Sequence, residues 1–198
     1  MKNESNKVLN LLNPTRKIVK EYVDKFDDGV EGINKNIIDG FVSHYGTSCD
    51  GIAAVSALIN TLYSTHIGAS DFAALTYGIF KIRELKNRLN AGDIALVSEI
   101  AGLLKTDNEN KKEYISFASK FCAFHNEAKF PIYDRISREM LAKINKTQSF
   151  TERFNKDKIP YEKYVEIYNS FIKKFGLEEL TYREVDKYLW SVGKELKV

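Results

Sequence analysis

The chain has 198 residues, of which 43% are hydrophobic and 29% charged. These proportions predict a globular protein that is long enough to bury a core without covalent cross-links. No apolar run reaches the length of about eighteen residues that a membrane span needs, and the polar N-terminus lacks the apolar core of a secretory signal. Two cysteines, Cys49 and Cys122, exclude four-cysteine zinc and iron–sulfur sites. We therefore expect a protein of the reducing cytoplasm that does not associate with membranes.

The net charge of +3 is unevenly distributed along the chain. Residues 1–104 carry 11 Lys and Arg against 12 Asp and Glu, whereas residues 111–158 carry 11 against 6. A basic segment on a near-neutral chain is typical of proteins that bind polyanions. A solvated surface gives the same pattern, so charge alone leaves both interpretations open.

In the first half of the chain the apolar residues recur at helical spacing. We expect a helix after Pro14, because proline is favoured in a first helical turn. Ser48 or Asp50 can cap the next helix through a side-chain oxygen, and Ser70 can cap the one after it. Asp93 can start a further helix over 94–104.

The second half begins with a polar, loop-like segment at 104–112. A strongly apolar helix follows from Ile115, and we expect Pro131 to open another helix that runs through Lys143. A polar connector at 145–158 then leads to the last part of the chain.

Two further helices complete the prediction. Pro160 opens one that ends at Gly176, as a C-terminal glycine would end it, and Thr181 with Glu184 forms a capping box for the last. Because few stretches alternate with a period of two, we predict an all-α protein of about eight or nine helices. It is expected to form one compact domain over residues 1–198.

Most sequence signatures of enzymes are absent. The chain contains no phosphate-binding P-loop, no GxGxxG, no HExxH and no GxSxG motif. Its three histidines, His44, His66 and His125, are far apart and lack ligand spacing with the cysteines. We therefore expect neither a metal nor a cofactor.

The most informative stretch is residues 114–144, in which an apolar helix leads through a short polar loop to Phe-Pro-Ile-Tyr-Asp and a basic helix. This stretch resembles the catalytic part of the helix–hairpin–helix (HhH-GPD) DNA glycosylases. In that family a Pro-apolar-x-Asp element places the catalytic carboxylate at a helix N-terminus, and Asp134 matches it. Ser116 falls where strand-cleaving members carry a lysine nucleophile, and Ala118 falls on the family's alanine.

A weaker resemblance lies at residues 59–67, where Tyr63 matches the side chain that fills the gap left by a flipped base. The resemblance as a whole implies a two-lobed helical bundle of the HhH-GPD type, with the hairpin and catalytic region at about 104–144. One departure concerns the hairpin, because residues 106–112 lack the glycines of the family's phosphate-binding turn. Two alternatives follow. Either lysines hold the phosphate instead, the candidates being Lys111, Lys112 and Lys120, or the protein no longer binds DNA as the family does.

The resemblance implies a monofunctional DNA N-glycosylase that leaves an abasic site. Asp134 would stabilise the positive charge that develops on the sugar when the base leaves. Ser116 has no amine and cannot form a Schiff base. Lys120 lies one helical turn further on, so a displaced nucleophile is a second possibility.

The remaining site residues follow from the same resemblance. Polar and aromatic candidates for the base pocket are Asn60, Ser64, Thr65, Ser116, His125, Asn126 and Tyr133. Candidates for contacts to double-stranded DNA are Tyr63, Arg135 and Arg138, together with the three lysines named above. The excised base is either damaged or mispaired, or a modified base of phage DNA such as glucosylated hydroxymethylcytosine.

Two other functions remain open at this point. A non-catalytic DNA-binding or protein-interaction module would use Asp134 as an ordinary helix cap. A nuclease would need clustered acidic residues for metal ions, and Asp24, Asp27 and Asp28 are the nearest approach to such a cluster. No obligate protein partner is evident from the sequence.

Overall fold

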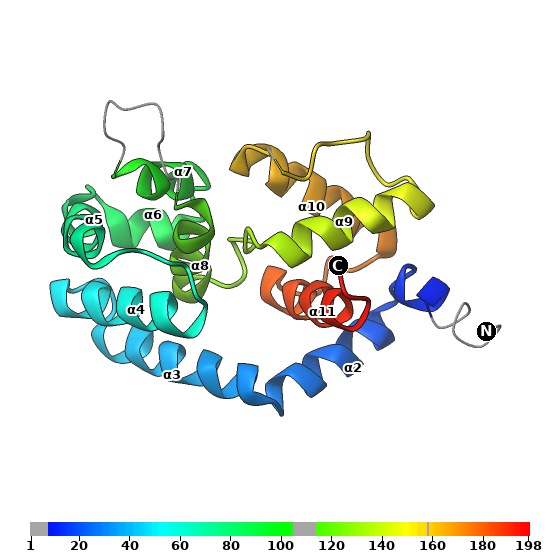
Figure 1. Cartoon of the computed structure of the whole chain (residues 1–198), viewed down its shortest axis with the longest axis horizontal. Coiled ribbons are helices and arrows are strands. Elements are labelled where there is room, and N and C mark those ends of the chain that lie inside the picture. Colours follow the sequence, from blue (N-terminus) through cyan, green and yellow to red (C-terminus); the bar gives the residue numbers. More distant parts are fainter. Residues whose placement is uncertain (1–7, 105–113, 158) are drawn as a thin grey trace. The chain divides into compact units, whose positions relative to one another are not determined.

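A computed structural model describes residues 8–104, 114–157 and 159–198. Within these ranges the chain forms ten helices of seven residues or more and no strand, which confirms the all-α class (Figure 1). The count exceeds the eight or nine predicted. One reason is the short helix α6 (Leu85–Ala91), which follows a left-handed turn at Glu84 with φ of 56° that the apolar pattern does not indicate.

The chain divides into two compact units. Unit 1 combines residues 1–30 with residues 131–198, and unit 2 consists of residues 31–130. The single domain expected over residues 1–198 stays a prediction. No helix of the described residues is both long enough and apolar enough to cross a lipid bilayer.

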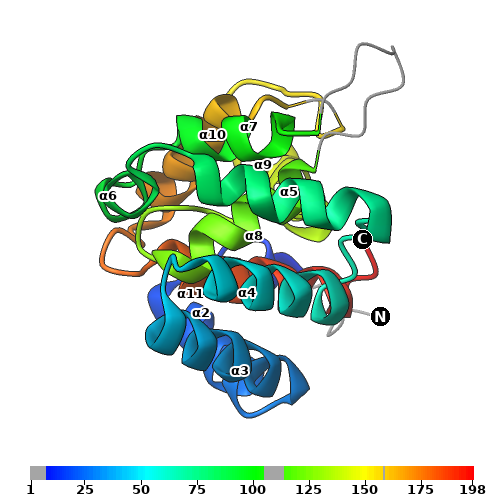
Figure 2. The same ribbon diagram turned by 90° about the vertical axis from the view of Figure 1, so that its left-hand side faces the viewer.

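Unit 2 is built around α8 (Ile115–His125), which packs against α4 (Cys49–Leu62), α6 and α7 (Ala95–Gly102). Every residue from Phe117 to Phe124 is buried, so α8 is enclosed all round. Figure 2 looks onto the outer helices of the unit. The unit also contains α3 (Val30–Tyr45) and α5 (Ala69–Lys81), and α5 packs against α4 and α7.

The helix starts of unit 2 follow the predicted caps in part. Ser48 caps α4 as expected, and its Oγ accepts a hydrogen bond from the amide of Gly51 at 3.1 Å. The prediction for Ser70 is wrong, because α5 begins at Ala69 with Gly68 as its N-cap. Gly68 has no side chain, so this helix starts without a side-chain cap.

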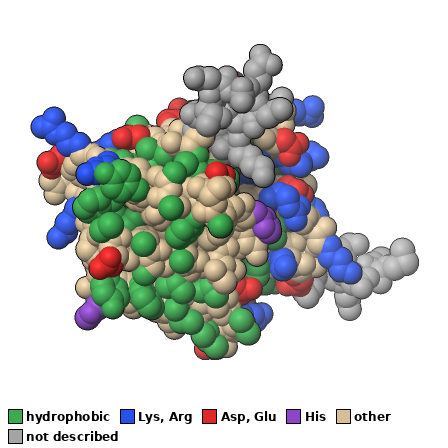
Figure 3. Space-filling model, turned by 60° about the vertical axis from the view of Figure 1, so that its left-hand side comes forward, with side chains coloured by type: hydrophobic (Ala, Val, Ile, Leu, Met, Phe, Trp, Pro, Cys, Tyr) green, Lys and Arg blue, Asp and Glu red, His purple; other side chains and the backbone are tan. Residues whose placement is uncertain are grey.

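Large hydrophobic side chains are exposed on two outer helices of unit 2. Figure 3 shows how widely hydrophobic side chains spread over one face of the molecule. The exposed ones are Ile33, Ile37, Phe41 and Tyr45 on α3, and Tyr77 and Phe80 on α5. A surface of this composition does not attract the phosphates of DNA, so a DNA contact requires a different face.

Unit 1 contains α2 (Arg16–Asp27), α9 (Arg135–Gln148), α10 (Tyr161–Phe175) and α11 (Tyr182–Glu195), and α11 packs against both α2 and α9. A buried polar network joins α9 and α11. Asp186 accepts hydrogen bonds from Ser137 Oγ at 2.9 Å and from Arg183 Nη1 at 3.0 Å. Because each charge in this network has a partner, the two helices can bury it together.

The caps of unit 1 mostly agree with the sequence. Thr181 and Glu184 form the predicted capping box, and Gly176 ends α10 in a left-handed conformation with φ of 63°. The predicted start of a helix at Pro131 is wrong. Helix α9 begins at Arg135, because Asp134 is the N-cap and the residues before it are not helical.

The close contact between α11 and α9 generates a prediction. A Cβ added to Gly193 would overlap Cγ2 of Ile136 and lie 2.9 Å from Cγ of Met140. We expect Gly193→Ala to lower the free energy of unfolding by about 1–3 kcal/mol, measured by urea denaturation. The matched control is Gly40→Ala on α3, where nothing lies within 4 Å. That variant should be about 0.5–1 kcal/mol more stable, because alanine favours helix more than glycine. Equal effects at both positions would contradict the packing described here.

Candidate functional site

Asp134 occupies the N-cap position of α9. Its Oδ1 accepts a hydrogen bond from the amide of Ile136 at 2.8 Å, and the residue is partly exposed. The carboxylate therefore lies at the positive end of the helix dipole. The arrangement therefore presents a negative charge at a defined position in unit 1.

Hydrogen bonds from α10 fix the segment that leads into Asp134. Tyr161 donates its hydroxyl hydrogen to the carbonyl of Pro131 at 2.8 Å, and Tyr164 donates to the carbonyl of Ile132 at 2.7 Å. Burial, followed by the negative charges of Asp186 and Asp134, raises the pKa of Tyr164 well above its ordinary value. Both donors are buried, so the backbone immediately before the carboxylate is held in place.

Tyr133 and Arg138 extend this fixed region toward the connector after α9. The Tyr133 hydroxyl donates to the carbonyl of Ile159 at 2.9 Å, and the Arg138 guanidinium lies 4.5 Å from the centre of the Tyr133 ring. Arg138 also donates to the carbonyl of Lys156. Arg135 is exposed and pairs with Glu139 at 2.8 Å. Of the two arginines proposed to contact DNA, Arg135 is therefore the more accessible, because Arg138 also holds the connector.

In unit 2 the structure brings Ser116 and Lys120 together on α8. The Lys120 side chain is buried, with 4% of the residue exposed, and its Nζ donates to Ser116 Oγ at 2.8 Å. The amine therefore lies beside the hydroxyl of Ser116. The other two lysines proposed to bind phosphate, Lys111 and Lys112, lie outside the described residues.

Asn60 organises the loop after α4. Its Oδ1 accepts hydrogen bonds from Thr65 Oγ1 and from the amide of Ile67, both at 2.9 Å, and its Nδ2 donates to the Ile67 carbonyl at 3.0 Å. The loop contains a left-handed residue at the exposed Ser64, with φ of 47°. Tyr63 precedes it and packs edge-on against Phe124 of α8, with ring centres 5.5 Å apart. Asn60 and Thr65 thus shape the loop in which Tyr63 and Ser64 lie.

Two polar residues at the end of α8 also have structural contacts. Asn126 donates from Nδ2 to the carbonyl of Leu89 at 3.1 Å and to that of Asn90 at 3.2 Å. His125 Nδ1 lies 2.8 Å from the carbonyl of Phe121. Burial lowers the pKa of His125 below its ordinary value, against the opposing effect of the Phe121 and Gly46 carbonyls. The imidazole is therefore predominantly neutral at neutral pH, and Nδ1 carries the proton.

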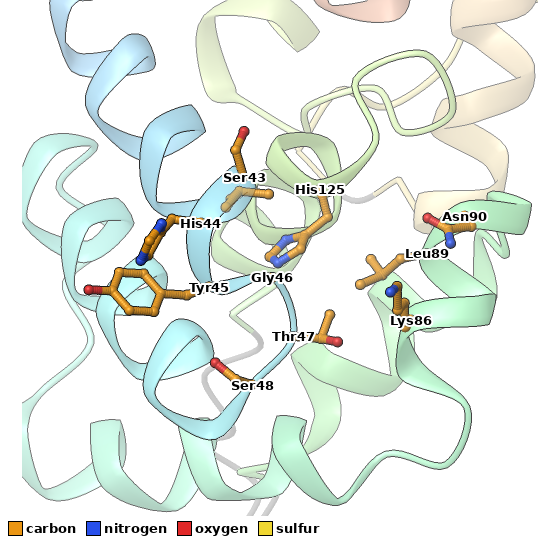
Figure 4. Close-up of a pocket in the computed structure, with 11 residues that line it drawn as sticks. Ser43, His44, Tyr45, Gly46, Thr47, Ser48, Lys86, Leu89, Asn90 and His125 are labelled. Atoms are coloured by element: carbon orange, nitrogen blue, oxygen red, sulfur yellow. The ribbon is translucent and has the colours of Figure 1, made fainter.

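His125 also lines a cavity of about 460 Å³ within unit 2 (Figure 4). The cavity lies where the turn between α3 and α4 faces α6. His125 is a site residue predicted from the sequence, whereas the other polar lining residues, among them Thr47, Lys86 and Asn90, are not. No motif marks them, because they come from separate segments.

The acidic residues considered for a nuclease do not form a metal site. Asp27 accepts hydrogen bonds from Lys187 Nζ at 2.7 Å on both carboxylate oxygens. Among the residues that the structure describes, no three His, Cys, Asp or Glu side chains gather as metal ligands do.

A family model described as the HI_0787_N N-terminal domain matches residues 18–129. The chain belongs to the HI_0787_N family. The matched segment ends one residue before the end of unit 2, so it includes α8 and the cavity. Asp134 lies five residues beyond it. The description names no activity, and the site has to be interpreted from its own geometry.

A protein of Haemophilus influenzae, named as uncharacterized, is 39% identical to the chain over 137 residues. The similarity covers 69% of this chain and 63% of the relative, so the chain matches less than two thirds of the relative's length. No solved structure is significantly similar.

The hydrogen bonds from Tyr161 and Tyr164 to the segment before Asp134 generate a prediction. Tyr164→Phe removes the donor to the buried Ile132 carbonyl, and we expect it to lower the free energy of unfolding by about 1–2 kcal/mol in thermal or urea denaturation. Tyr182→Phe is the matched control. The Tyr182 hydroxyl donates to Asn169 at 2.6 Å near the surface, and its loss should cost less than about 0.5 kcal/mol. Equal losses would show that the Ile132 carbonyl does not depend on Tyr164.

Proposed function

We propose that the protein is a monofunctional DNA N-glycosylase of the helix–hairpin–helix type. The observation that carries this proposal is the placement of Asp134. Its carboxylate caps α9, and two buried tyrosine hydroxyls hold the backbone that leads into it. Electrostatic catalysis requires a charge that does not have to reorganise when the reaction occurs, and this arrangement meets that requirement.

The chemistry follows from the carboxylate. The target nucleotide is turned out of the duplex, since its sugar–base bond is otherwise out of reach. As the bond between C1′ and the base nitrogen breaks, positive charge develops on the sugar and Asp134 stabilises it. A water molecule adds to C1′ and its proton is transferred to the carboxylate or to the departing base. The products are a free base and an abasic site.

The basic character of residues 111–158 supports a DNA substrate. Within the described part of this segment, exposed cations include Arg135, Lys146 and Arg153. Contacts from such residues to phosphates position a protein on DNA without reading its sequence. The base that is excised, whether damaged or a glucosylated hydroxymethylcytosine of phage DNA, stays a hypothesis that rests on the sequence. Ser64 and His66 are exposed polar residues of the loop after α4.

A second function is favoured by one specific contact. The hydrogen bond from Ile136 to Asp134 is that of an ordinary helix cap, which a non-catalytic DNA-binding or protein-interaction module would also need. The two functions differ in whether they need the negative charge. Stabilising a positively charged sugar requires it, whereas a helix cap needs only an oxygen that accepts a hydrogen bond.

Replacing Asp134 by asparagine separates the two functions. Asparagine caps a helix as well as aspartate does, so Asp134→Asn should keep its melting temperature while base release falls at least about 100-fold. The assay incubates the protein with cellular DNA and with phage DNA that carries modified bases, in EDTA. Free bases are measured by mass spectrometry and abasic sites by alkaline cleavage.

Asp157→Asn, an exposed carboxylate on the connector, is the matched control and should retain full activity. Base release by the Asp134→Asn variant at the wild-type rate would exclude Asp134 as the catalytic residue. Absence of base release by the wild type from every DNA tested would favour the non-catalytic module.

Covalent trapping tests whether the enzyme is monofunctional. Ser116 cannot form a Schiff base, so sodium borohydride should not cross-link the wild type to its DNA substrate. The buried Lys120 amine beside Ser116 is the one alternative nucleophile that the geometry suggests. A borohydride-dependent complex that is lost in Lys120→Gln, but not in Lys129→Gln, would show that Lys120 acts as a nucleophile and that the enzyme also cleaves strands.

A further inference from the structure

One outer face of unit 2 is apolar over three helices. Figures 1 and 2 both place α4 between α3 and α5, and α4 packs against α5. In Figure 3, where these helices come forward, hydrophobic side chains spread over the surface with few charged ones among them. The large exposed side chains of this α3–α5 face are Ile33, Ile37, Phe41 and Tyr45 of α3, and Tyr77 and Phe80 of α5.

The aromatic side chains of the α3–α5 face are strongly exposed. Tyr77 exposes 60% of its surface and Tyr45 exposes 45%. Single exposed apolar residues are common on soluble proteins, whereas a patch that extends over several helices marks an interaction surface. Phe41 and Tyr45 stack on each other, with ring centres 5.7 Å apart. Rings that are already held by such a contact lose little freedom when a partner covers them.

The α3–α5 face carries little charge. Residues 49–80 include two charged residues, Asp50 and Asp71, and Asp71 is already hydrogen-bonded within unit 2. On α3, Lys35 and Asp39 form an ion pair with each other at 2.5 Å. A partner with a strongly charged surface would therefore find little counter-charge on this face.

These properties favour a second copy of the chain as the partner. In a symmetric dimer both copies contribute the same surface, so a net charge on it would repel its own copy, and a neutral face avoids that repulsion. The buried centre of homodimer interfaces is likewise apolar, rich in aromatic residues and poor in charges. A membrane surface would instead favour many Lys and Arg beside the apolar side chains. Helices α3 to α5 contain two lysines, Lys35 and Lys81, and Lys35 is already paired.

The area of the face is close to what a reversible dimer needs. An aromatic side chain offers roughly 150–250 Å² for burial, and the four of this face expose between 37% and 60% of their surfaces. Together with the two isoleucines they offer on the order of 500 Å². The exposed Ala57, Ala73 and Ala74 add to this area. Specific interfaces cover about 600 to 800 Å² on each partner.

We propose that two copies of the chain associate through the α3–α5 face in a symmetric, reversible dimer, in which Phe41 and Tyr77 of each copy are buried. The association uses unit 2 alone and does not depend on the glycosylase proposal. The face contains none of the residues proposed for catalysis or for contacts to DNA.

Sedimentation equilibrium of the full chain, from about 1 to about 200 µM, tests the proposal. We expect the average mass to rise from that of one chain toward twice that value, with a Kd on the order of micromolar. Hydrogen exchange measured at the two ends of this range should show the additional protection in α3, α4 and α5.

Variants assign the interface. Phe41→Lys on α3 and Tyr77→Lys on α5 each remove an aromatic contact and bring like charges into the interface, so each should raise the Kd at least about tenfold. Leu9→Lys is the matched control, because Leu9 is 56% exposed but belongs to unit 1, and it should leave the Kd unchanged. Melting temperatures measured below the wild-type Kd verify that each variant is folded.

Three outcomes would overturn the proposal. A wild-type chain that stays monomeric at about 200 µM would exclude a second copy as the partner. Flotation with phosphatidylcholine–phosphatidylglycerol vesicles would then show whether a lipid surface covers the face, and failure to bind them would leave a different protein as the occupant. A dimer that neither Phe41→Lys nor Tyr77→Lys weakens would show that the copies meet elsewhere. A dimer that only one of the two weakens would contradict an interface that spans α3 and α5.

Discussion

The feature on which unit 1 depends is the buried, non-helical segment before α9. A helix would satisfy its own backbone, but a segment that contains Pro131 and enters α9 from outside leaves carbonyls that need donors from elsewhere. Tyr161 and Tyr164, three residues apart on α10, provide them. The same two contacts therefore join α10 to the start of α9 and fix the position of Asp134. One set of hydrogen bonds thus meets a structural requirement and, in the proposed function, also the need for a fixed carboxylate.

The main constraint in unit 2 is the burial of α8 on all sides. The apolar residues of α8 account for most of that burial, but the helix also carries Lys120, whose charge cannot be placed in an apolar interior without a partner. The Ser116 hydroxyl one turn earlier is one such partner, because it accepts a hydrogen bond from Lys120 Nζ. The polar residues of α8 thus have structural roles that do not depend on catalysis, and the chemical proposal depends more on Asp134 than on them.

The local predictions succeeded where one short segment contained the whole interaction. Ser48, the Thr181–Glu184 capping box and Gly176 each act within a few residues, and each was confirmed. The prediction for Ser70 was wrong because Gly68, two residues earlier, is the N-cap of α5 and has the extended conformation that an N-cap needs. The predicted helix start at Pro131 was wrong because the Pro131 carbonyl accepts a hydrogen bond from a tyrosine thirty residues away, and no local rule includes such a contact.

The sequence by itself determined the all-α class and several of the helix ends, since helical spacing and capping motifs are local properties. The choice of Asp134 as the catalytic residue rests on a sequence resemblance and stays a prediction. The tertiary structure alone decided which polar side chains meet. Asn60 with Ile67, Ser137 with Asp186, and the cavity that joins Thr47, Lys86 and His125 all depend on contacts between residues that are separated along the chain. Such contacts arise when helices pack to exclude water, and apolar spacing specifies that a face is buried without specifying what it is buried against.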